Sequence, residues 1–145
     1  MDVTSDVTSD VTPGVASDAS AGVPAGRFDA FAASCPSRRL LDTIGNKWAS
    51  LVIAALGLDG RSRYSDLSAR IAGVSQKMLT QTLRNLERDG LVTRTVTPSV
   101  PVRVDYELTP LGRSLLDTVC RLKMWAEEHM PEVDRAREEY DRRNA

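Results

Sequence analysis

The spacing of apolar residues changes at Gly90, and this change limits the folds open to the chain more than any other feature. Before it, leucines recur at helical intervals on one side of residues 76–89, namely Leu79, Leu83 and Leu86. After it, residues 91–96 and 102–108 are rich in β-branched and aromatic residues that partly alternate with polar ones. The sequence therefore predicts an amphipathic helix followed by a β-hairpin with a proline-containing tip.

Three helices are predicted upstream of this pair. Pro36 suits the first position of a helix that ends at Gly45. Asn46 can cap the second helix, which ends in a turn at residues 59–60. Ser65 is predicted to cap the third helix, which follows a short strand-forming segment.

A tight turn at Gly73 separates the third helix from the helix that Ser75 is predicted to cap. This order of elements is that of a winged helix-turn-helix, with the hairpin as the wing. The predicted fold class is mainly α with a small β-hairpin wing (α+β). The face opposite the leucines carries side chains that read base edges or hold phosphates, namely Gln76, Lys77, Thr80, Gln81, Arg84, Asn85 and Arg88.

The charge distribution favours a polyanionic partner although the net charge is −1. Residues 35–113 contain 12 Lys and Arg against 7 Asp and Glu, whereas both ends of the chain are acidic. A basic block of this kind is the electrostatic pattern expected where phosphates bind. No apolar run approaches the roughly 20 residues of a membrane span, and the N-terminus does not resemble a secretory signal, so we expect a cytoplasmic protein without membrane contact.

Thr109 is predicted to cap a last helix that runs from about Pro110 to His129 and is interrupted by Pro131. This helix and the first one carry more apolar surface than a small domain needs. We expect them to be dimerisation helices of a homodimer, through Leu40, Leu41, Leu115, Leu116, Val119, Leu122 and Trp125. The expected organisation is a disordered N-terminal tail over 1–34, a DNA-binding and dimerisation domain over 35–130, and a charged extension over 131–145. A frayed helical extension stays open for residues 132–143.

The residues of these elements closely resemble the HxlR family of bacterial regulators, over about residues 35–126. The resembling motifs are Cys35-Pro36 and residues 44–48, 63–67, 73–94, 100–103 and 106–112. Asn46 stands where the family usually has a second glycine, and Tyr64 where it usually has phenylalanine.

The resemblance implies a cytoplasmic homodimer that binds palindromic double-stranded DNA and regulates transcription, with repression as the expected direction. The family's recognition contacts fall on Ser75, Lys77, Thr80, Gln81 and Arg84, and its basic wing contact falls on Arg103. Arg63 is either a phosphate ligand or an ordinary solvated arginine.

The cysteines suggest how the regulator is controlled. Cys35 lies at the N-terminus of the first predicted helix, near Arg38 and Arg39, where its thiolate should be stabilised. Several members of the resembled family use the cysteine at this position to sense oxidants or quinones. The alternative is a buried structural cysteine. Cys120 is either the disulfide partner of Cys35 or, more simply, a packing residue.

Other functions find less support in the sequence. We expect no cofactor, no catalytic residues and no metal site, because no phosphate loop, catalytic triad or metal-ligand spacing is present. Control by a small-molecule ligand without redox chemistry, with Trp48, Met124 and Trp125 lining a pocket rather than packing, stays open. A winged-helix protein-interaction module also stays open, although such a surface should show exposed apolar anchors.

Overall fold

The computed structural model describes residues 28–145, which divide into two compact units at residues 43 and 44. The first unit contains turns and then all but the last residue of α2 (Pro36–Ile44), which ends one residue before Gly45 as predicted. The disordered tail expected over residues 1–34 falls mostly outside the described residues. Each unit is described by itself below.

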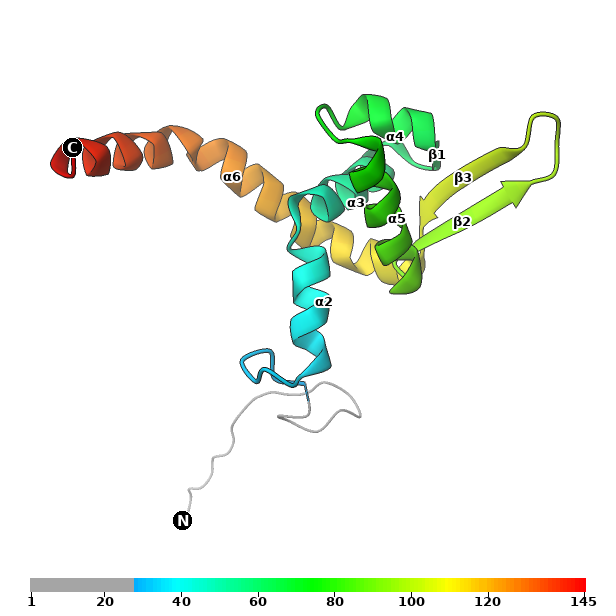
Figure 1. Ribbon diagram of the computed structural model, residues 1–145, viewed down its shortest axis with the longest axis horizontal. Helices are drawn as coiled ribbons and strands as arrows, with labels where there is room; N and C mark the ends of the chain where they lie inside the picture. The colour runs from blue at the N-terminus through cyan, green and yellow to red at the C-terminus, as the bar shows by residue number, and fades with distance from the viewer. Residues whose placement is uncertain (1–27) are drawn as a thin grey trace, which may run out of the picture. The chain divides into compact units, whose positions relative to one another are not determined.

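The second unit, Ile44–Ala145, contains four helices and a small sheet (Figure 1). Its elements in chain order are α3 (Lys47–Asp59), β1 (Ser62–Arg63), α4 (Tyr64–Arg70), α5 (Gln76–Arg88), β2 (Val92–Thr97), β3 (Arg103–Leu108) and α6 (Pro110–Arg143). The sheet is antiparallel with the order β1-β3-β2, and the hairpin register pairs Val92 with Leu108 and Thr97 with Arg103. The hairpin projects beyond α5 as a wing (Figure 1). The predicted mainly α winged helix-turn-helix is therefore confirmed.

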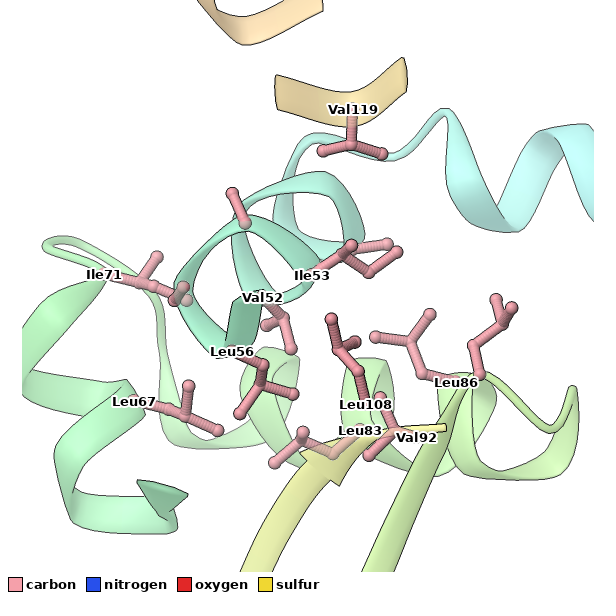
Figure 2. Close-up of a cluster of buried hydrophobic side chains, with 14 of the residues drawn as sticks. Val52, Ile53, Leu56, Leu67, Ile71, Leu83, Leu86, Val92, Leu108 and Val119 are labelled. Carbon is pink, nitrogen blue, oxygen red and sulfur yellow. The ribbon is translucent and has the colours of Figure 1, made fainter. Parts of the chain in front are cut away.

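The core of this unit forms around α3, which contacts α4, α5, α6 and β3. Val52, Ile53 and Leu56 of α3 are each at most 2% exposed. The predicted leucines of α5, Leu67 and Ile71 near α4, and Val92 and Leu108 of the hairpin bury against them (Figure 2). Val119 joins this cluster from α6. The apolar faces of α4, α5, α6 and β3 therefore pack on a single central helix.

The close approach of α6 depends on two glycines. A Cβ atom at Gly57 of α3 would collide with the side chain of Leu116. A Cβ atom at Gly112 of α6 would collide with the backbone carbonyl of Leu91. Because backbone cannot move aside as easily as a flexible side chain, Gly112 fixes the start of α6 against the base of the wing.

The predicted caps are confirmed at three helices and wrong at one. Side-chain oxygens of Asn46, Ser75 and Thr109 accept backbone N–H bonds at the starts of α3, α5 and α6. Ser65 does not cap α4, because that helix begins at Tyr64. The Asp66 carboxylate accepts the backbone N–H of Arg63 at 2.9 Å, which closes the first turn earlier than predicted.

Pro131 does not interrupt the last helix, so the predicted interruption is also wrong, whereas residues 132–143 are helical, as the alternative of a helical extension has it. α6 continues through Pro131 to Arg143, although proline removes one helical N–H donor. Residues 132–143 are mostly Glu, Arg and Ala, which are strong helix formers. The pair of Lys123 and Glu127, at 2.6 Å, adds support in the turn before the proline. The C-terminal half of α6 extends away from the core of its unit (Figure 1).

Candidate nucleic-acid interface

The turn before α5 orients the helix that carries the predicted DNA contacts. Gly73 adopts φ +88°, which a residue with a side chain rarely adopts, and this allows the chain to reverse between α4 and α5. The Ser75 hydroxyl then accepts the backbone N–H of Met78 at 3.0 Å and closes the first turn of α5. Because Leu79, Leu83 and Leu86 are buried, the opposite face of α5 is directed outward.

Most predicted recognition side chains on α5 are exposed. The exposed ones are Ser75, Gln76, Lys77, Gln81 and Arg84, and Thr80 is half-buried. The Gln81 amide donates to the side chain of Asn85 at 3.0 Å, one turn along the helix. α5 thus presents amide, hydroxyl and guanidinium groups on one side, which are the groups that recognise base edges in the major groove.

A hollow of about 440 Å³ lies between α5 and the wing. One of the residues that line it was missed by the sequence prediction. The lining of the hollow consists of Thr80, Leu83, Arg84, Glu87, Arg94 and Tyr106. Arg94, on β2, was not predicted as a DNA contact. The sequence did contain a signal for the position of Arg94. Side chains alternate between the two faces of a strand, so Arg94 lies on the same face of β2 as Val92, which is buried toward the core. The hollow therefore places a second cation beside Arg84.

The wing's charged side chains are organised by Asp105, a residue only 4% exposed. The Nε of Arg103 donates to its carboxylate at 3.0 Å, and the guanidinium of Arg61 lies 3.6 Å from the same oxygen. Arg61 also pairs with Glu107 at 3.3 Å. The hydrogen bond from Arg103, together with the nearby positive charges, lowers the pKa of Asp105 although its burial opposes this.

Arg103, the predicted wing contact, lies at the start of β3 beside the hairpin tip. It pairs with Thr97 at the last register position before the hairpin tip. Arg63 is exposed and lies on β1, at the edge of the wing sheet. Its backbone is opposite that of Asp105 in the register of β1 with β3. The structure thus separates the predicted contacts into two groups, one on α5 and one on the wing sheet.

The two cysteines lie in different units. Cys35 is half-buried, and its Sγ lies 3.0 Å from the Ser37 hydroxyl. This hydrogen bond is the main cause that lowers the pKa of the Cys35 thiol. Ser37 was not considered in the sequence prediction, which named the helix dipole, Arg38 and Arg39. Cys120 is half-buried and packs against the core around α3, as a packing residue should.

The side chains predicted for dimerisation differ in exposure. Leu40, Leu41, Leu122 and Trp125 are 44%, 51%, 62% and 55% exposed. Leu115 and Leu116 are half-buried, and Val119 belongs to the core of its own unit. The Trp125 ring stacks on His129 with centroids 4.5 Å apart, and Met124 is exposed, whereas Trp48 packs against the core.

Residues 28–145 contain neither a membrane-spanning helix nor a candidate metal centre. None of the helices over this range is long and apolar enough to cross a membrane. No group of three or more His, Cys, Asp or Glu residues in this part of the chain is placed to hold a metal ion.

Most of this chain matches the model of one protein family. Residues 43–134 match the model of the HxlR-like helix-turn-helix family. The chain belongs to this family. The HxlR-like match spans α3 to α6 and includes both groups of predicted contacts. The chain is therefore a helix-turn-helix transcriptional regulator.

Individual relatives of this chain are regulators as well. The uncharacterised HTH-type regulator YtfH of Escherichia coli is 45% identical over 109 residues, which cover 75% of this chain and 86% of YtfH. The structure of a transcriptional regulator ytfH from Salmonella typhimurium is 44% identical with a TM-score of 0.72, covering 77% of this chain and 98% of that one. The redox regulator HypR in its oxidised form is 39% identical with a TM-score of 0.59, over 65% and 96% of the two chains.

The Asp105 arrangement predicts how stability depends on pH. Because the folded pKa of Asp105 is lowered, its charge stabilises the fold above the unfolded value near 3.8, and this contribution is lost as the pH falls through the folded pKa. We expect Asp105→Asn to lower the free energy of unfolding at pH 6 and to have a smaller effect at pH 3. Chemical denaturation at both pH values measures this. An equal effect at pH 6 and pH 3 would contradict the prediction.

Proposed function

We propose that this regulator binds double-stranded DNA sequence-specifically, with α5 in the major groove and the wing against the phosphate backbone. The observation that carries the proposal is the outward polar face of α5, which lies beside the hollow that Arg84 and Arg94 line. Base edges in the major groove are read by such amide, hydroxyl and guanidinium groups. Arg94 and Arg103 supply positive charge on the wing, where the DNA backbone passes a winged helix.

Substitutions should separate the base-reading residues from the phosphate-binding ones. Arg84→Ala should weaken binding to the specific site by about 1–3 kcal/mol while changing nonspecific binding less. Arg103→Ala and Lys77→Ala should weaken binding to all sequences and reduce the salt dependence by about one released counterion each. Fluorescence anisotropy with DNA from upstream of the chain's own gene, over a series of salt concentrations, measures both effects.

Arg137→Ala provides the matched control, because it removes an exposed arginine from the C-terminal half of α6. It should leave both affinity and salt dependence unchanged. If the Arg84 and Arg103 variants behave like this control, α5 and the wing do not contact DNA.

We further propose that the chain binds DNA as a homodimer, on a palindromic operator. Exposed apolar side chains on α6, among them Leu122 and Trp125, support this, because they continue the apolar surface of the helix beyond Cys120, the last α6 residue that packs against the core. Apolar side chains of α2 are exposed as well within their own unit. A two-fold dimer would present two copies of α5 to two half-sites.

We also propose that oxidation of Cys35 controls DNA binding. The lowered pKa of its thiol favours the reactive thiolate, and the similar protein HypR is described as a redox regulator. Oxidation would join the sulfur to that of a second thiol, Cys35 or Cys120 of the partner subunit, while the oxidant takes up two electrons and two protons. Such a bond would change the spacing of the two α5 helices and thereby the affinity for the operator.

The role of Ser37 makes the Cys35 proposal testable. In a Cys120→Ser background, the alkylation rate of Cys35 should follow a pH profile whose midpoint lies below that of an ordinary cysteine. Ser37→Ala should move this midpoint upward, because the thiolate loses its hydrogen bond. Stopped-flow measurement with iodoacetamide between pH 6 and pH 10 gives both midpoints.

DNA titration with and without diamide then tests the sensing step. Wild-type affinity should change on oxidation, and the affinity of Cys35→Ser should not. An equal response in the two proteins would exclude Cys35 as the sensor and favour control by a ligand.

A further inference from the structure

Tyr64 connects the two helices of the helix-turn-helix through its hydroxyl group. It is the first residue of α4 and is half-buried, with its ring against the core. Its hydroxyl oxygen lies 3.0 Å from the carbonyl oxygen of Gln76, at the first residue of α5, and 3.5 Å from the hydroxyl oxygen of Thr80. One polar atom of α4 thus meets two polar atoms in the first turns of the predicted recognition helix.

The proton positions in this group follow from the chemistry of its members. A carbonyl oxygen only accepts, so the single proton of the Tyr64 hydroxyl is donated to Gln76. The Tyr64 oxygen can then only accept from Thr80, whose hydroxyl proton therefore points toward Tyr64. The Thr80 oxygen retains its lone pairs as acceptors for a further partner.

Thr80 also lines the hollow between α5 and the wing, together with Arg84. Resting on the proposed DNA-binding function, we infer that Tyr64 is a specificity-determining residue, because it fixes the Thr80 hydroxyl as a hydrogen-bond acceptor toward the DNA. An acceptor favours adenine N6 or cytosine N4, which carry N–H donors in the major groove, over guanine and thymine, whose polar major-groove atoms only accept. Without the tyrosine hydroxyl, Thr80 could rotate and donate to those bases as well.

Removing the hydroxyl should change specificity without unfolding the motif. The Gln76 carbonyl also accepts the helical N–H four residues later, so it keeps a partner in Tyr64→Phe. The aromatic ring that packs against the core is retained. The expected effect is therefore confined to the base opposite Thr80, where discrimination between donor and acceptor bases should fall about three- to tenfold, the size of one hydrogen bond.

Selection from a randomised double-stranded DNA library, followed by sequencing, measures preference at every base pair. The proteins are wild type, Tyr64→Phe, Thr80→Val, the double variant, and Tyr140→Phe, which makes the same chemical change at an exposed site on α6. Tyr64→Phe should relax preference at one position per half-site, and Thr80→Val should alter the same position. In the double variant, Tyr64→Phe should add nothing to Thr80→Val. Tyr140→Phe should reproduce the wild-type motif.

The outcomes separate this inference from the function on which it rests. If wild type enriches no sequence, the proposed DNA recognition fails and the inference fails with it. If wild type enriches a motif and Tyr64→Phe enriches the same motif with equal preference at every base, the inference alone is overturned. A uniform loss of affinity in Tyr64→Phe, with preferences unchanged, would likewise show that Tyr64 only packs the two helices.

Discussion

The buried helix α3 determines where every other functional part of the second unit lies. Its side chains are buried on several sides, and α4, α5, α6 and β3 each bury apolar residues against it. Because interiors are close-packed, the leucines of α5 can bury in few other ways, and this fixes which face of α5 is exposed. The polar surface available to DNA is therefore a consequence of the packing on the opposite side of the same helix.

Ion pairs order the arginine side chains of the wing, as apolar packing determines the orientation of α5. Strands alone would leave long arginine side chains free to adopt many rotamers, and ordering them on binding costs free energy. The Asp105 carboxylate, nearly buried, holds both Arg61 and Arg103 before any ligand arrives. The wing thus offers a partly ordered cation, and the hollow between the wing and α5 adds the guanidinium groups of Arg84 and Arg94.

The sequence predicted those features that depend on local pattern. The cap at Ser75, the leucines of α5, the turn at Gly73 and the hairpin follow from residue spacing, and the structure confirms them. The contribution of Arg94 and the pairing of Arg103 with Asp105 depend on cross-strand and helix-to-wing distances, which spacing does not provide. The end of the last helix was mispredicted because strong helix formers after Pro131 outweigh the loss of one hydrogen bond.

We propose that two copies of α5 read two half-sites of one operator, with a wing beside each. Hydroxyl-radical footprinting and guanine-methylation protection on the DNA upstream of the chain's own gene test it most directly. We expect protected guanines in two major-groove segments, separated by about one helical turn of DNA or a multiple of it, with backbone protection flanking each segment. A single protected segment, or backbone protection without major-groove protection, would contradict it.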